Sequence, residues 1–248
     1  ICNKLIEAGA CGVMTQKLSE AEVLLNSGIL YGDKNILISQ EISDPTKLER
    51  LVGMTVAMGE GKVLTSIDNL QEAEMISRIA ERWGVKQDVI IEITHGRCGV
   101  PPGEDAVKMA KRIVKLPGLR FRGIYGYENP VPRETALERD KLTVDTAEAI
   151  RAAGIEVEIV SAGSTATYEV TGTYPGITEI EPGSFVFGAG KEGSGYGWET
   201  INDVYFKNSL TVLTQVISDN FQNRVVTDAG AKVMSGGHAG VEPVVLVQ

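Results

Sequence analysis

The sequence predicts an α/β fold, a (β/α)₈ TIM-type barrel whose first strand is missing from the chain, followed by the start of an antiparallel β domain. Short β-branched runs alternate with longer helical stretches through most of the chain. Several runs are apolar nearly throughout, as is typical of parallel strands buried on both faces. After about residue 200 this alternation stops, which predicts the second domain.

Seven strands are predicted in the barrel. They lie at 12–15, 35–39, 62–66, 88–94, 119–125, 156–161 and 177–187. A closed barrel of this kind needs eight strands. The chain begins at Ile1, inside a helical pattern, and not with Met. We therefore expect the first strand to precede Ile1 and the sequence to be a fragment of a longer chain.

Helices are predicted between the strands. They lie at 19–27, 44–58, 69–83, 103–115 and 133–153. Asp68 and Asn69, followed by Leu70 and Gln71, are typical of a helix start. Gly84 lies where a glycine C-cap ends such a helix.

The second domain is predicted from two further strands, at 209–218 and 224–227, with no long helix between them. We place a barrel domain at 1–200 and the start of a truncated β domain at 201–248. The glycine-rich stretch 188–197 is interpreted as a loop or domain junction. The chain stops at Gln248 inside an apolar, strand-like run.

Composition narrows the class of protein. The 248 residues are 43% hydrophobic and carry a net charge of −9 without a basic run, so nucleic acid is not an expected partner. No apolar run approaches the ~18 residues of a membrane span, and no signal peptide is visible. Three cysteines without CxxC spacing predict reduced thiols in a cytoplasmic protein.

In such barrels the functional residues follow the carboxyl ends of the strands. The hydroxyl-rich turn at 163–167 contains Gly163, Ser164 and Thr165. It is either an anion cradle suited to a phosphate or a tight turn whose hydroxyls cap a helix. Gly183 and Ser184 are candidates for a second side of the same cradle.

Two further candidates follow neighbouring strands. Arg97 has a fixed charge that suits an anionic group or a phenolate oxygen. The alternative is a structural salt bridge, for instance to Glu92 or Glu128. Tyr127 either donates a hydrogen bond to a heterocycle or fills the barrel mouth.

The remaining reactive residues point less clearly to chemistry. His95 at a strand end is either a general acid/base or a structural histidine. His238 lies in a glycine loop without a partner at metal-ligand spacing. Cys98 is interpreted as a small packed residue and not as a nucleophile.

Motifs at these same loops resemble a known family. They are GVMT at 12–15, KLSEAE at 17–22, RCGVPPGE at 97–104, LPGLRFRG at 116–123, VSAGST at 160–165, PGITEI at 175–180, LTVL at 210–213 and TDAG at 227–230. In this order they resemble the D-threonine aldolase / D-serine dehydratase family. The resemblance covers essentially the whole chain and implies an alanine-racemase-like barrel that binds pyridoxal phosphate.

The resemblance also assigns roles to residues. Arg97 is implied near the 3′ oxygen of the cofactor and Tyr127 at its pyridine nitrogen. The phosphate is implied to bind Gly163, Ser164 and Thr165, helped by Gly183 and Ser184.

The groups that complete such a site are expected outside the chain. The Schiff-base lysine is expected before Ile1. We do not assign that role to Lys17, which lies at a helix entry. The ligands of a divalent metal, Mn²⁺, Mg²⁺ or Zn²⁺, are expected after Gln248. Three departures from many relatives are Ser164, Asn129-Pro130 and Phe185.

The activity implied is that of a lyase, which cleaves D-β-hydroxy amino acids to glycine and an aldehyde. Elimination of the D-serine dehydratase type is an alternative, because the two reactions share parts. A non-catalytic, pyridoxal-phosphate-binding fragment is a further alternative, because the lysine and metal ligands are absent from this chain. The implied partners are a small D-amino acid and, in the full-length protein, a second copy in a homodimer.

Overall fold

A computed structural model describes residues 1–28, 34–127, 131–187, 206–207, 209, 211–229 and 233. Its main feature is a parallel sheet of seven strands in the order β1-β2-β3-β4-β5-β6-β7. The strands are β1 Gly12–Thr15, β2 Asn35–Ile38, β3 Val63–Ile67, β4 Gln87–Glu92, β5 Leu119–Tyr127, β6 Ile159–Gly163 and β7 Glu179–Ile180. The seven predicted barrel strands are therefore confirmed, in a sheet whose sequence order is also its spatial order.

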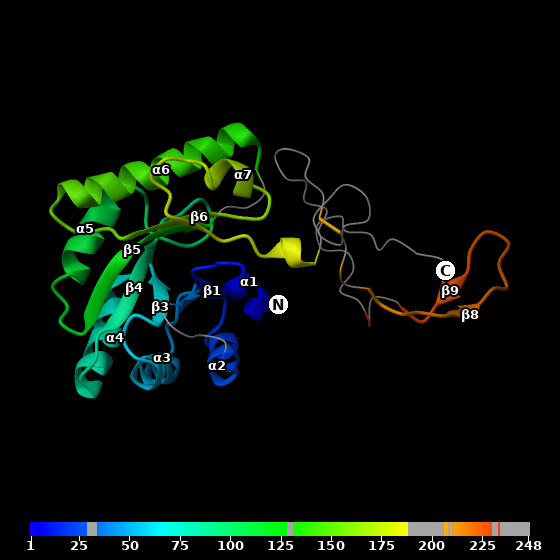
Figure 1. Cartoon of the computed structure of the whole chain (residues 1–248), viewed down its shortest axis with the longest axis horizontal. Coiled ribbons are helices and arrows are strands. Elements are labelled where there is room, and N and C mark those ends of the chain that lie inside the picture. The colour runs from blue at the N-terminus through cyan, green and yellow to red at the C-terminus, as the bar shows by residue number, and fades with distance from the viewer. Residues whose placement is uncertain are drawn as a thin grey trace.

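Helices connect the strands and lie around the outside of the sheet (Figure 1). They are α1 Cys2–Glu7, α2 Leu18–Asn26, α3 Pro45–Met58, α4 Leu70–Trp83, α5 Glu104–Ile113, α6 Arg133–Ala152 and α7 Tyr168–Thr171. Asn69 begins α4 by accepting a hydrogen bond from the Glu72 N–H at 2.8 Å, and Gly84 ends it in the left-handed conformation. Both caps were predicted from the sequence.

The strand pattern sends alternate side chains to two different cores. On β2, Ile36 and Ile38 are fully buried in the larger core, between the sheet and the helices, together with Leu48 and Leu51 of α3. Leu37, which lies between the two isoleucines, belongs to a separate, smaller core. This double burial explains why the strands are apolar nearly throughout.

The smaller core lies on the inner face of the curled sheet. Its members come from five successive strands: Leu37, Leu64, Ile90, Tyr125 and Ile159. The curl brings the two edge strands together, since the Cys11 thiol just before β1 lies 3.7 Å from a carboxylate oxygen of Glu179 in β7. The sheet is thus an incomplete barrel.

An ion network covers the inner face at the amino ends of the strands. Asp88 near the start of β4 is fully buried and binds Arg120 at 2.6 Å and Arg122 at 2.5 Å. Arg122 also holds both carboxylate oxygens of Glu158, at 2.7 Å and 2.6 Å. Each carboxylate in this network has a cationic partner, which is how proteins keep buried charges.

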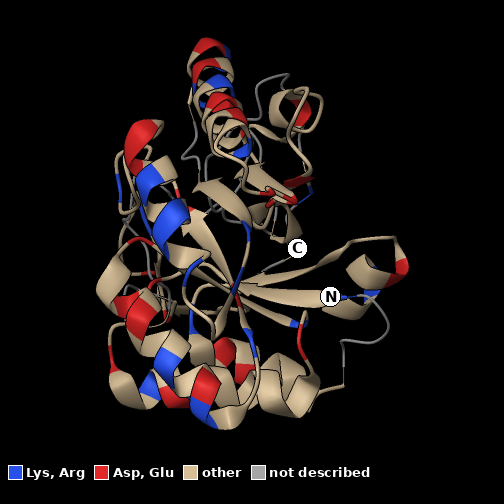
Figure 2. Cartoon of the chain, turned by 90° about the vertical axis from the view of Figure 1, so that its left-hand side faces the viewer, with Lys and Arg blue, Asp and Glu red and all other residues tan. Residues whose placement is uncertain are grey.

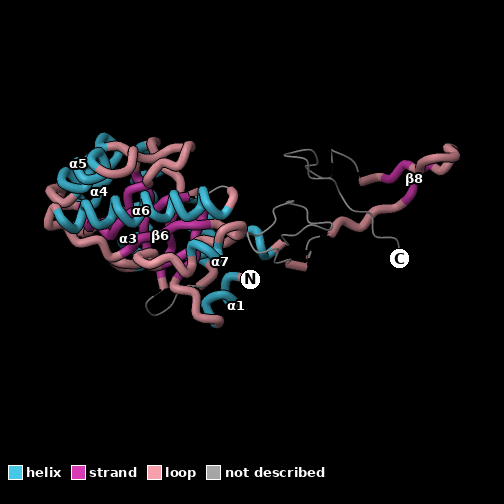
Figure 3. Tube along the Cα trace, turned by 90° about the horizontal axis from the view of Figure 1, so that it is seen from above, coloured by secondary structure: helices cyan, strands magenta, loops and turns pink. Residues whose placement is uncertain are grey.

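Some predicted boundaries were too generous. The predicted strand 177–187 contains only the two residues of β7, and a 3₁₀ turn, η1 Ser184–Val186, follows. Pro182 cannot donate to a strand ladder, and it interrupts the run. The short helix α7 was not predicted. In the last part of the chain, β8 Val216–Ser218 and β9 Val226–Thr227 form a separate antiparallel sheet (Figures 1 and 3).

The outer surface mixes charges of both signs on its helices (Figure 2). Among the residues that the structure describes, no helix combines the length and the apolar character that crossing a membrane requires.

Candidate functional site

Three neighbouring strands bring the predicted residues to one edge of the sheet. In the parallel register, Glu92 of β4 is the partner of Tyr125 in β5. Two residues further along β5, Tyr127 is the partner of Gly163, the last residue of β6. Adjacent strands lie about 4.8 Å apart. The carboxyl ends of β4, β5 and β6 therefore lie side by side at one edge of the sheet.

The turn after β6 forms a tight cup. Gly163 has φ +85°, and a Cβ there would lie 3.0 Å from Thr171 Cγ2, so the turn needs glycine at this position. The Ser164 N–H donates to Thr167 Oγ1 at 3.0 Å, and the Thr167 N–H donates back to the Ser164 carbonyl at 3.2 Å. Ser164, Thr165 and Thr167 are all buried.

The segment after β7 lies against this cup. The Phe185 N–H donates to Thr165 Oγ1 at 3.1 Å, which places Gly183 and Ser184 beside the turn. Gly183 is exposed and Ser184 is half-buried. The structure thus brings together the two stretches that were predicted to form two sides of one cradle.

One hydroxyl of the cup has no partner. Ser164 is 5% exposed, and its Oγ finds no hydrogen-bond partner among the described residues. A buried hydroxyl usually has a partner, and one without it marks a position where a ligand or water can bind. The cup therefore has the open donor that an anionic ligand needs.

Arg97 and Tyr127 lie together at the ends of β4 and β5. The guanidinium carbon of Arg97 lies 4.7 Å from the centre of the Tyr127 ring, which is a cation–π contact. Arg97 also binds Glu92 Oε1 at 3.1 Å. The salt bridge to Glu92 that the sequence suggested is therefore confirmed, and it leaves other N–H groups of the fork for a ligand.

Two groups beside Arg97 were not predicted as site residues. Glu41, just after β2, and Cys98 lie with Glu92 in a group whose ligand atoms are all within 4.8 Å of one another. Burial, and then contact with Glu92, raise the pKa of Glu41 to about 7. Burial, and then the hydrogen bond to Glu92, raise the pKa of the Cys98 thiol to about 12. This thiol stays protonated, which agrees with its interpretation as a packed residue.

A second buried acid lies on the other side of Tyr125. Ser161 of β6 donates to Glu181 Oε1 at 2.5 Å, while Glu181 Oε2 has no partner among the described residues. Burial raises the pKa of Glu181 to about 8. The site thus contains two acids with raised pKa values, Glu41 and Glu181, beside a cation, Arg97.

His95 lies outside this group. Its Nε2 lies 3.1 Å from Thr143 Oγ1 on α6, and burial lowers the pKa of His95 to about 4. A neutral imidazole held against a helix favours the structural interpretation. His238, Glu128 and Asn129-Pro130 lie outside the described residues.

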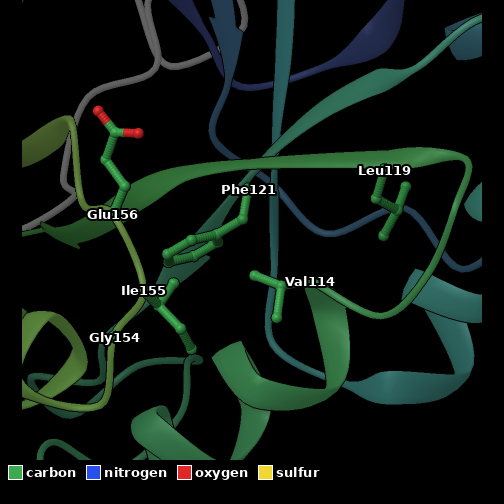
Figure 4. Close-up of a pocket in the computed structure, with 6 residues that line it drawn as sticks. All are labelled: Val114, Leu119, Phe121, Gly154, Ile155 and Glu156. Atoms are coloured by element: carbon green, nitrogen blue, oxygen red, sulfur yellow. The ribbon is translucent and has the colours of Figure 1, made fainter.

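A pocket at the opposite end of the strands does not serve this site. It is lined by the following residues, shown in Figure 4: Val114, Leu119, Phe121, Gly154, Ile155 and Glu156. Side chains at the amino end of a barrel generally serve stability, and this lining offers one carboxylate among apolar groups. We assign it no ligand.

Comparison with known proteins identifies the family. The family described as alanine racemase, N-terminal domain, matches residues 1–191. The chain belongs to this family. The match spans all seven strands of the incomplete barrel and includes the cup at its carboxyl end.

The chain is similar to an aldolase and to a dehydratase. The chain is 30% identical over 239 residues to a 3-hydroxy-D-aspartate aldolase of Paracoccus denitrificans, covering 92% of this chain and 60% of the relative. It is 29% identical over 191 residues to a D-threo-3-hydroxyaspartate dehydratase of a Delftia species, covering 73% of this chain and 48% of the relative.

The solved structure of a D-threonine aldolase from Filomicrobium marinum is similar across nearly the whole chain. The TM-score is 0.83 at 30% identity, covering 94% of this chain and 63% of that structure. The chain therefore spans about three fifths of the length of its aldolase relatives.

Proposed function

We propose that this chain is the barrel part of a pyridoxal-phosphate-dependent lyase, which cleaves D-β-hydroxy amino acids to glycine and an aldehyde. The observation that carries the proposal is the cup at 163–167, beside Arg97 and Tyr127, in which the Ser164 hydroxyl has no partner among the described residues. Membership of the alanine racemase N-terminal domain family and similarity to two kinds of D-hydroxyamino acid aldolase support it.

The residues present fit the cofactor. A phosphate needs several donors converging on one spot. Gly163, Ser164 and Thr165 form a turn of that kind, and Gly183 and Ser184 border it. The flat face of a pyridine ring suits a position beside Tyr127, whose register partner is Gly163. In this proposal Arg97 binds the ring's 3′ oxygen and Tyr127 faces the ring nitrogen.

Bound pyridoxal phosphate supplies an electron sink for the bond that breaks at Cα. The chain's own residues bind and orient it. Arg97 holds a permanent positive charge at the ring oxygen, and the buried cup fixes the phosphate at the other end. The raised pKa values of Glu181, about 8, and of Glu41, about 7, make these two acids the candidates for proton transfer in this proposal.

The cleavage itself breaks the Cα–Cβ bond of the substrate. The β-hydroxyl loses its proton and becomes the aldehyde oxygen, while Cα gains a proton to give glycine. The lysine that binds the cofactor and the ligands of Mn²⁺, Mg²⁺ or Zn²⁺ remain predicted before Ile1 and after Gln248. The homodimer and the cytoplasmic location also remain predictions.

A dehydratase is the second candidate, because the chain is also 29% identical to a dehydratase. The test is to incubate the protein expressed from its complete coding region with pyridoxal phosphate, Mn²⁺ and D-threonine or D-3-hydroxyaspartate. Glycine and an aldehyde are expected. Ammonia and a keto acid would show elimination, and cofactor binding without either product would show a non-catalytic protein.

The site assignment is tested separately by replacing Arg97 with Ala. The affinity for pyridoxal phosphate should fall about tenfold, because charge-assisted hydrogen bonds contribute more than neutral ones. Arg112→Ala, which removes another ion-paired arginine at the surface of α5, is the matched control and should leave the affinity unchanged. An unchanged affinity in Arg97→Ala would remove Arg97 from the site.

A further inference from the structure

Two carboxyl groups meet behind Arg97. Glu92, at the end of β4, has a side chain that is 2% exposed, and Glu41, which follows β2, is half-buried. Glu41 Oε1 and Glu92 Oε2 are both buried, and no donor of the described residues reaches them. Two carboxyl groups this close repel each other when both are charged, and this repulsion together with burial favours the protonated form of Glu41.

The other oxygen of Glu92 faces outward to the site. Glu92 Oε1 accepts from Arg97 at 3.1 Å and from the Cys98 thiol at 3.2 Å. The Arg97 side chain is 46% exposed, and an exposed arginine ordinarily samples many rotamers. The buried carboxylate of Glu92 restricts that freedom because it accepts from the guanidinium, and the Tyr127 ring packs against the face of the guanidinium.

We propose that Glu92 is a positioning residue for Arg97. Its carboxylate, which lies against Glu41 and accepts from the Cys98 thiol, fixes the guanidinium over Tyr127 with its remaining N–H groups toward the ring oxygen of the cofactor. The inference rests on the proposed function, because it assigns Arg97 an oxygen of pyridoxal phosphate to bind.

The same three side chains, Glu41, Glu92 and Cys98, also have the spacing of a cation site. The position of Arg97 argues against a metal there. Its guanidinium already binds Glu92 Oε1, and a second cation at that oxygen would repel it. A proton on Glu41 lowers the negative charge of the group without this repulsion.

The proton makes the group sensitive to pH. Burial, and then contact with Glu92, raise the pKa of Glu41 to about 7, so Glu41 gains its proton below about pH 7 and loses it above. The charged and titratable groups that face the pair are Arg97, Cys98, Tyr125, Glu181 and Glu72. Cys98 is therefore a natural reporter of the charge on the pair.

The experiment measures cofactor affinity and thiol reactivity in the same variants. The full-length protein is prepared with Cys2→Ser and Cys11→Ser, so that Cys98 is the one thiol left in residues 1–248. A thiol elsewhere in the protein is distinguished by mass spectrometry. Pyridoxal phosphate affinity is titrated by fluorescence, and Cys98 alkylation by iodoacetamide is followed from pH 6 to pH 9. The variants are Glu92→Gln, Glu92→Asp, Glu41→Gln and, as a surface control, Glu74→Gln.

Glu92→Gln should weaken cofactor affinity about tenfold and speed alkylation of Cys98 by a similar factor, because it removes a charge-assisted partner from both Arg97 and the thiol. Glu92→Asp keeps the charge and should recover part of the affinity. The wild-type alkylation profile should inflect near pH 7, and Glu41→Gln should lack that inflection. Glu74→Gln should match wild type throughout.

A double-mutant cycle with Arg97→Ala distinguishes a positioning role of Glu92 from a general disturbance of the structure. If Glu92 acts through Arg97, Glu92→Gln has no further effect on cofactor affinity once Arg97 is gone. Losses of cofactor affinity that add in the double variant would overturn the proposal, as would an unchanged affinity in Glu92→Gln. Faster alkylation of Cys98 after treatment with a chelator would show a metal at this group and would also overturn it. Should Glu92→Gln fail to fold, Glu92→Asp serves in the same cycle, with a smaller loss expected.

Failure of the proposed function gives a different result. A wild-type protein that does not bind pyridoxal phosphate would overturn both ideas. A wild-type protein that binds it, with a Glu92→Gln variant that binds equally well, would overturn the positioning role alone.

Discussion

The two ends of the barrel's inner face carry similar residues but satisfy them differently. At the amino ends of the strands, Asp88 is buried between Arg120 and Arg122, and Glu158 completes the network. At the carboxyl ends, oxygens of several buried groups have no partner among the described residues. They belong to Glu41, Glu92, Glu181 and Ser164.

This difference separates stability from binding. A buried polar group with all its partners stabilises one conformation, whereas one without a partner raises the free energy of the empty state until a proton or a ligand binds it. The apolar layer of the inner core, which includes Leu64 and Ile90, separates the two ends. We therefore expect substitutions at the amino end to change unfolding and those at the carboxyl end to change binding.

The largest effect is expected for Asp88→Asn. It removes the buried carboxylate that binds Arg120 and Arg122, which keep only more exposed partners, and breaking a buried ion pair from one side costs about 3–5 kcal/mol. Urea unfolding followed by circular dichroism measures this loss. Asp145→Asn, which breaks a surface pair with Lys141 on α6, is the control and should cost under about 1 kcal/mol. Equal losses in the two variants would contradict the comparison.

A pH effect of about 2 kcal/mol is expected at the other end. Burial raises the pKa of Glu181 to about 8, so between pH 6 and pH 8 the folded protein keeps a proton that the unfolded chain has released. Stability therefore falls as the pH rises through this window, by up to about 1.4 kcal/mol per pH unit.

Glu181→Gln should remove that part of the slope, since the amide oxygen still accepts from Ser161 but does not titrate. Unfolding measured at pH 6, 7 and 8 compares the variant with wild type. The exposed Glu104→Gln is the control and should keep the wild-type slope. Parallel slopes in Glu181→Gln and wild type would show that Glu181 is ionised throughout.

Ser164→Ala should separate binding from stability. The hydroxyl has no partner to lose in the part of the chain that the structure describes, so the free energy of unfolding should change by less than about 0.5 kcal/mol, while pyridoxal phosphate affinity falls about tenfold. Ser77→Ala is the opposite case, because Ser77 Oγ is buried and accepts from the Gly118 N–H at 3.1 Å. It should cost about 1 kcal/mol of stability and leave the affinity unchanged.

Much of the fold could be predicted because the hydrophobic pattern identifies strands and helices, and the cap residues mark where helices begin and end. Continuous apolar runs with β-branched residues became parallel strands, and Asn69 and Gly84 bounded α4 as expected. The last strand was overextended because hydrophobicity alone was followed through Pro182. The strand predicted at 209–218 was overextended too, since only Val216–Ser218 forms a ladder and its apolar side chains are largely exposed.

The site could be predicted only in part. Arg97, Tyr127 and the cup at 163–167 follow strands, so their common edge was predictable from topology. Glu41 was not identified, because a single acid after an apolar run gives no sign that its side chain turns inward to meet Glu92. The pairing depends on the curl of the sheet, which brings the segment after β2 next to the end of β4 and leaves no pattern in the sequence.

The smallest effect is expected for Glu158→Gln, and it tests whether burial or mere pairing explains the network. Glu158 binds Arg122 through both oxygens, but its side chain is 57% exposed. Water can replace an exposed carboxylate, so the loss should stay below about 1 kcal/mol by urea unfolding, despite the good geometry. Asp88→Asn in the same network is the matched comparison. A loss at Glu158 as large as the loss at Asp88 would mean that the network acts as one cooperative unit, and that burial of each member does not determine its contribution.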